Sequence, residues 1–142
     1  PHAVNFVDGL APLLNAVGNE PGLRIVVFAL DETTLSRELA PLAGAFPALF
    51  LGPAWWFLDA PDGIKRFREA VTETAGFYNT VGFNDDTRAF PSLPARHDMA
   101  RRLDAAFLAE RVTDHRMSET EAHQIAYDLT VTLPRQTYRL PV

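Results

Sequence analysis

Three short apolar runs, separated by helically spaced segments, constrain the fold of this chain more than any other feature. The runs lie at 24–30, 48–51 and 80–83. The first run is continuous and rich in β-branched residues, which is typical of a strand buried on both faces. Apolar residues recur every three or four positions after the first two runs, and this spacing predicts helices over 33–44 and 64–74. Connections that short, with one helix each, indicate βαβ units of a parallel sheet.

Helical spacing also fills both ends of the chain, outside this alternation. We predict helices over 4–17, 96–111 and 118–133. The last of these opens with Ser118 and Glu121 at the spacing of a capping box. Pro134 is expected to end or kink that helix, because proline lacks the backbone N–H that a helix interior needs.

Three strands are too few for a stable open sheet of parallel strands. Such a sheet has two exposed edges and little room for helices on both faces. A (β/α) barrel has no edges, but it needs eight units and typically about 250 residues. No linker divides the chain, so we predict one structural unit of the α/β class over 1–142. Residues 1–93 would form the last three units of a TIM barrel, and 94–142 the terminal helices of the same domain.

The composition excludes several classes of protein. The chain contains no cysteine, which rules out a disulfide scaffold, an iron–sulfur cluster and a thiol nucleophile built from its own residues. Its net charge of −5 argues against a nucleic-acid partner, whose binding would call for a basic excess. No apolar run approaches the roughly 18 residues of a membrane span, so we predict no membrane partner. The lack of cysteine fits a reducing compartment, and we expect a cytoplasmic protein.

The loops after the predicted strands are the expected place for a ligand, because parallel α/β folds bind ligands at the carboxyl ends of their strands. These loops are 31–34, 52–56 and 84–88. In the third loop, Asp86 and Arg88 could project the same way from an extended backbone. An aspartate there could bind a divalent metal or move a proton, and an arginine could hold a carboxylate through two parallel hydrogen bonds. The alternative is that these polar residues cap the next helix and that Arg88 pairs with them.

Other conspicuous residues are equally open to two interpretations. Trp55 and Trp56 should point to opposite faces of an extended segment, so at most one of them is expected to line a pocket, and core packing is the alternative for each. His97 could be a ligand, but beside Asp98 it is more typical of a surface or cap residue. A solvated helix face, with acidic neighbours, is expected for Arg101, Arg102, Arg111 and Arg116.

Three of these segments together resemble the C-terminal part of the uronate isomerase (glucuronate isomerase) family. They are Gly52–Phe57 (GPAWWF), Val81–Phe90 (VGFNDDTRAF) and Ala95–Asp98 (ARHD) followed by Arg101 and Arg102. Leu30–Thr34 (LDETT) fits the segment that precedes them, and the likeness runs over essentially the whole chain. The family belongs to the amidohydrolase superfamily, so the resemblance implies a metal-dependent-hydrolase-type TIM barrel.

The resemblance also implies a reaction and roles for individual residues. Enzymes of this family interconvert D-glucuronate with D-fructuronate, and D-galacturonate with D-tagaturonate, in bacterial hexuronate breakdown. By the resemblance, Asp86 is the aspartate beside a divalent metal, expected to be zinc, and serves as base or ligand. Arg88 is the active-site arginine, and one of Trp55 and Trp56 lines the sugar pocket. The His-x-His metal ligands of the family have no match in this sequence, so the site needs the rest of the barrel as a partner.

Two other functions remain open at this point. One is a metal-dependent hydrolase on the same type of barrel. The other is a non-catalytic helical interaction module, which predicts that Asp86 and Arg88 are buried in a closed ion pair. For the isolated 142 residues we predict no isomerase activity and an aggregated or loosely packed state, because a truncated barrel exposes its edges. A homo-oligomer is compatible with all of these.

Overall fold

The computed structural model describes residues 4–141 and opens with a helix followed by a strand. Helix α1 (Phe6–Val17) begins at Asn5, whose side chain accepts a hydrogen bond from the backbone N–H of Asp8, and it ends at Gly18. The strand β1 (Ile25–Val27) follows. It is shorter than the run at 24–30 and only half-buried, so the prediction of a strand buried on both faces is wrong. In the described part of the chain β1 has a neighbour on one side only.

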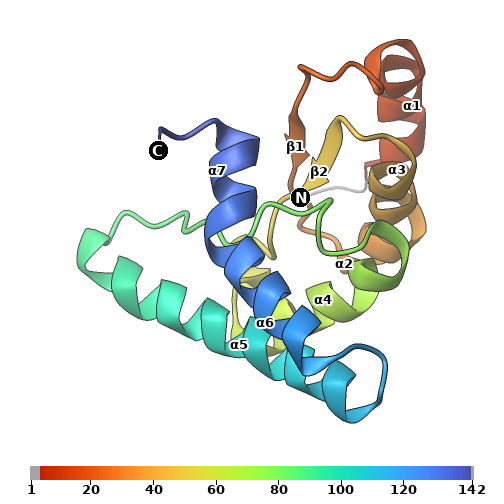
Figure 1. Cartoon of the computed structure of the whole chain (residues 1–142). Coiled ribbons are helices and arrows are strands. Elements are labelled where there is room, and N and C mark those ends of the chain that lie inside the picture. The colour runs from red at the N-terminus through yellow and green to blue at the C-terminus, as the bar shows by residue number, and fades with distance from the viewer. Residues whose placement is uncertain (1–3, 142) are drawn as a thin grey trace.

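A continuous helical segment connects β1 to the second strand. It consists of α2 (Glu32–Thr34), one π-helical turn (Leu35–Leu39) and α3 (Ala40–Ala45), which together match the helix predicted over 33–44. The strand β2 (Leu49–Leu51) then runs parallel to β1, as expected for a βαβ unit. Figure 1 shows α1 and α3 lying along the same side of the two strands.

The third predicted strand is reduced to a single residue. Thr80 forms a parallel bridge with Leu51, and no strand is assigned over 80–83. Gly82 explains the interruption, because its φ of 76° takes the backbone out of the extended conformation. A Cβ at this glycine would lie 2.2 Å from the carbonyl oxygen of Leu129, so the chain runs tightly beneath the C-terminal helices there.

Helix α4 (Pro61–Ala75) packs against α3 and ends one residue beyond the helix predicted over 64–74, with Gly76 at its C-cap. Its apolar face carries Ile64, Phe67 and Val71, all buried. They belong to one core with residues from α1, from the segment between the strands and from β2, including Leu14, Leu39, Leu49 and Leu51.

A buried ion pair joins α4 to α5 (Leu93–Thr113). Arg68 donates from Nε and Nη2 to the two carboxylate oxygens of Asp104, at 2.6 and 3.0 Å. Its Nη1 also donates to the hydroxyl of Thr80, at 3.3 Å. One arginine therefore fixes two helices and the residue that bridges to β2.

The C-terminal helices pack on a second apolar cluster. They are α5, α6 (Glu119–Tyr127), a π-helical turn (Asp128–Thr132) and α7 (Leu133–Tyr138). The capping box at Ser118 and Glu121 is confirmed, with both reciprocal hydrogen bonds present. The cluster contains Phe77, Phe107, Leu108, Leu129 and Leu133. In Figure 1, α5 runs from the left of the view to the lower right, below the two strands, and α6 crosses it.

Pro134 does not end the last helical segment, so the first of the two outcomes predicted for it is not seen. The preceding π-helical turn bonds the N–H of Leu133 to the carbonyl of Asp128. Pro134 therefore stands at the start of a new helical segment, where its missing N–H costs nothing. The chain continues as helix to Tyr138.

Arg111 also departs from the prediction of a solvated arginine face. Its side chain is only 19% exposed, and its guanidinium lies 4.7 Å from the ring centre of Phe107. Arg101, Arg102 and Arg116 are exposed as expected. Among residues 4–141, no helix combines the length and the apolar character that a membrane crossing requires.

Candidate functional site

Two loops meet at the carboxyl ends of the parallel segments. One follows β2, and the other follows the bridge at Thr80. The indole Nε1–H of Trp55, in the first loop, donates to Oδ2 of Asp86, in the second, at 2.8 Å. Phe28, which follows β1, lies against Trp55 with ring centres 5.7 Å apart. The parallel arrangement therefore brings residues from three successive connections to one place.

The two tryptophans have different surroundings. Trp55 is half-buried, whereas Trp56 is 69% exposed. Both line a hollow of about 370 Å³, together with residues 59, 86, 87 and 96. The expectation that at most one tryptophan lines a pocket is therefore wrong for this hollow. Trp56 has a φ of 55°, so the segment is not extended and the alternation of faces does not apply.

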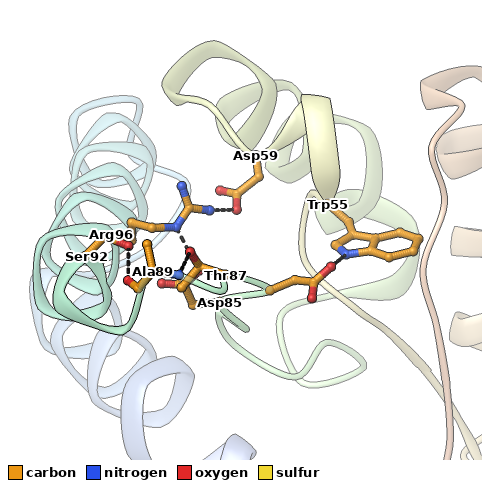
Figure 2. A network of polar contacts seen from close by, with 8 residues as sticks. Trp55, Asp59, Asp85, Thr87, Ala89, Ser92 and Arg96 are labelled. Carbon is orange, nitrogen blue, oxygen red and sulfur yellow. Dashed lines mark hydrogen bonds and ion pairs between the residues drawn. The ribbon is translucent and has the colours of Figure 1, made fainter.

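Two aspartates that lie close in the sequence to Asp86 and Trp55 form a network around one arginine (Figure 2). Arg96, near the start of α5, donates from Nε to Oδ1 of Asp85 at 2.7 Å and from Nη2 to Oδ2 of Asp59. The carboxylates of Asp59 and Asp85 are 5% and 1% exposed. Burial raises the pKa of Asp59, the positive charge of Arg96 opposes this, and the charge of Asp85 adds to it.

Hydrogen bonds hold the second loop at both of its ends. The hydroxyl of Thr87 accepts from the N–H of Ala89, and the hydroxyl of Ser92 donates to the carbonyl of Ala89, at 3.0 and 2.7 Å (Figure 2). At the other end, the hydroxyl of Tyr138 donates to Oδ1 of Asn84 at 3.1 Å. The loop is therefore held at the turn that leads into α5 and at the end of α7.

Asp86 and Arg88 are both exposed. Among residues 4–141, Arg88 makes no hydrogen bond or ion pair, and Asp86 bonds Trp55. The next long helix, α5, begins at Leu93, and its N-cap residue, Ser92, makes no side-chain capping bond. Neither the capping interpretation of these two residues nor the closed ion pair expected of an interaction module is therefore seen.

The other predicted loop and histidine have structural roles. Asp31 caps α2 by accepting from the N–H and the hydroxyl of Thr33, at 2.9 and 2.7 Å, and these bonds lower its pKa. The ring of His97 packs edge-on against Phe83 with centres 5.0 Å apart. His97 is half-buried and lies within α5, so it does not cap this helix.

The described residues supply part of a metal site at most. No group of three or more histidine, aspartate or glutamate side chains within 4–141 is arranged to hold a metal ion. Asp86 is an exposed carboxylate with one oxygen committed to Trp55, so it fits the role of a single ligand. Further ligands would have to come from outside residues 4–141.

Sequence reasoning missed Asp59, Asp85 and Arg96 as a network. Asp59 was not singled out, and Arg96 entered only as the first residue of the helix predicted over 96–111 and as part of the ARHD segment. The sequence did contain a signal for this network. An acidic residue lies close to Trp55, at 59, and another close to Asp86, at 85. Arg96 belongs to one of the segments that carry the resemblance.

Comparisons with known proteins give one consistent result. The glucuronate isomerase family matches residues 3–136. A uronate isomerase of Brucella melitensis is 65% identical over 140 residues, which cover 99% of this chain and 30% of that relative. The chain thus spans about 30% of the length of the curated relatives it matches.

Two solved structures share the fold. The crystal structure of glucuronate isomerase from Caulobacter crescentus superposes with a TM-score of 0.96 at 63% identity, over 100% of this chain and 30% of that one. The uronate isomerase of Thermotoga maritima superposes with a TM-score of 0.87 at 28% identity, over 96% and 30% respectively. With a match that takes in nearly every residue and the site loops among them, the chain belongs to the glucuronate isomerase family.

Proposed function

We propose that this chain forms the C-terminal part of a uronate isomerase, which interconverts D-glucuronate with D-fructuronate and D-galacturonate with D-tagaturonate. The observation that carries this proposal is the identity of 62–65% to proteins named uronate isomerase, sustained over 99% of the chain. The activity belongs to the complete enzyme, because these residues supply only one side of a site.

The proposed architecture is the last three units of an eight-stranded barrel. The parallel register of β1, β2 and Thr80 supports it, as does the half-buried edge of β1, which a further strand would cover. The rest of the barrel would then face the hollows around Trp55. A cytoplasmic location and a homo-oligomer stay predictions.

The proposed reaction moves hydrogen between two neighbouring carbons. The aldose loses one proton from C2 and one from the C2 hydroxyl, while C1 and its oxygen each gain one. Such a transfer proceeds through an enediolate and needs a base together with a positive group near the developing negative charge. Asp86 would take the proton or bind the metal, and Arg88 would hold the uronate carboxylate or the enediolate oxygen.

Trp55 would orient Asp86 and form a wall of the sugar pocket. Its indole N–H occupies one carboxylate oxygen, which leaves the other free to act. A divalent metal, expected to be zinc, would polarise the substrate oxygens when bound. Asp86 is the one carboxylate of this chain that we assign as a ligand of this metal.

Two substitutions in the complete enzyme test the proposal. Asp86→Asn is isosteric and should lower turnover of D-glucuronate by orders of magnitude while the fold stays intact, and it should lower the zinc content measured by elemental analysis. Arg88→Lys should also be harmful, because an ammonium cannot replace a planar fork of two donors. Asp62→Asn and Arg102→Lys, exposed residues of α4 and α5, serve as matched controls.

The assay is the formation of ketose from D-glucuronate. Near-normal turnover of Asp86→Asn would remove Asp86 from the mechanism, and an unchanged response of Arg88→Lys to substrate concentration would make Arg88 structural. Hydrolysis of an amide or ester by the complete enzyme, without isomerisation, would favour the metal-dependent hydrolase instead.

A further inference from the structure

We propose that Arg96 is a positioning residue, which holds the two site loops in register so that Trp55 reaches Asp86. Its two ion pairs connect the loop after β2 to the loop after Thr80 (Figure 2). This proposal rests on the proposed function only where it predicts a change in isomerase activity.

Each partner of Arg96 is firmly attached to a site residue. Asp85 directly precedes Asp86. Asp59 closes the tight turn that Trp55 opens, because the N–H of Leu58 donates to the carbonyl of Trp55 and the N–H of Asp59 to that of Trp56, both at 3.1 Å. A movement of either carboxylate is therefore passed on to Trp55 or to Asp86.

The charges explain why Arg96 is needed for this geometry. Two nearly fully buried carboxylates share a single guanidinium, and one oxygen of each, Oδ1 of Asp59 and Oδ2 of Asp85, has no partner among the described residues. Without Arg96, two like charges would remain buried and uncompensated. The repulsion between them would drive the two carboxylates apart and towards water, and moving apart separates the loops.

A purely structural role would look different. Arg68 offers the comparison, since it is also buried and bonds a carboxylate through two donors, but it joins α4 to α5 and lines neither of the two hollows that Asp86 borders. Weakening Arg68 should lower stability alone. Weakening Arg96 should lower stability and also displace the bond between Trp55 and Asp86.

The experiment compares Arg96→Gln, Arg96→Lys and Arg68→Lys in the complete enzyme. We expect Arg96→Gln to lower kcat by about 100-fold, the loss that a misplacement of about 1 Å can cause. Arg96→Lys should recover part of that loss, because it restores the charge but not both directed bonds. Arg68→Lys should lower the melting temperature and change kcat by less than about threefold.

A second readout does not depend on the reaction. In enzyme labelled with 5-fluorotryptophan, the Trp55 signal in the ¹⁹F NMR spectrum can be assigned as the one lost in Trp55→Phe. It should shift in both Arg96 variants and stay in place in Arg68→Lys. A Trp55 signal that does not move in Arg96→Lys would overturn the proposal, as would kcat within about threefold of wild type in that variant. If Arg96→Gln does not fold, the result for Arg96→Lys alone tests the proposal. If the complete enzyme has no isomerase activity, the NMR measurement still tests the proposal, because it does not depend on the reaction.

Discussion

Replacing Arg68 by methionine should be one of the most damaging single changes in this chain. Arg68 and Asp104 are 5% and 13% exposed, so the substitution leaves a buried carboxylate without its cation. Breaking a buried pair from one side costs about 3–5 kcal/mol of unfolding free energy. The lost bond to Thr80 adds little, because the hydroxyl of Thr80 still donates to the carbonyl of Phe77. We expect a total of about 4 kcal/mol.

The double variant Arg68→Met, Asp104→Leu separates the two possible causes of this loss, which are the unpaired buried charge and the lost packing of the arginine side chain. With both charges removed and the volume kept, stability should return to within about 1 kcal/mol of wild type or exceed it. Urea denaturation of the complete enzyme, followed by circular dichroism, measures all three proteins. Arg102→Met is the control, since its pair with Asp98 is exposed to solvent and contributes little to stability. A double variant as unstable as the single one would refute the reasoning, because lost packing would then be the cause.

Three further predictions concern single positions. The raised pKa of Asp59 means that the stability it contributes is present below the ordinary value of 3.8 and is lost as pH rises through the higher folded-state value. Asp59→Asn should therefore gain melting temperature relative to wild type as pH is raised above 3.8, and a difference that is constant with pH would contradict this. Gly82→Ala combines a φ of 76° with an added carbon 2.2 Å from the Leu129 carbonyl oxygen, so it should cost at least about 2 kcal/mol in urea denaturation. A cost under about 0.5 kcal/mol would show that the backbone can move. Ser118→Ala removes the cap of α6 and should cost about 1 kcal/mol, again measured in urea, and no measurable change would mean that the capping box is redundant.

Helices were predictable from the sequence because their signals are local. The cap at Ser118, the apolar spacing of Ile64, Phe67 and Val71, and the stop at Gly76 all lie within a few residues of the structure they determine. The run at 80–83 has the apolar character of a strand, but its central glycine adopts a positive φ that composition does not reveal. The prediction of this strand is therefore wrong because the backbone conformation at the glycine outweighs the strand propensity of its neighbours.

The sequence singles out candidate site residues but does not predict how they are arranged. Asp86, Arg88 and the tryptophans stand out by type and by place after the predicted strands. The bond between Trp55 and Asp86 spans 31 residues, and that between Asp59 and Arg96 spans 37. Contacts at such separations depend on how neighbouring βα units are aligned, which no local pattern encodes.

The two π-helical turns have a consequence for how the length of this chain can vary. Each turn closes a hydrogen bond over five residues instead of four, from Ala40 to Leu35 and from Leu133 to Asp128. Deleting one residue inside either turn would restore ordinary helical bonding without rotating the buried faces on its two sides. In a collection of related sequences, single-residue gaps should therefore gather within Leu35–Leu39 and Asp128–Thr132 and be rare in α4, where the same deletion would turn the apolar face by about 100°.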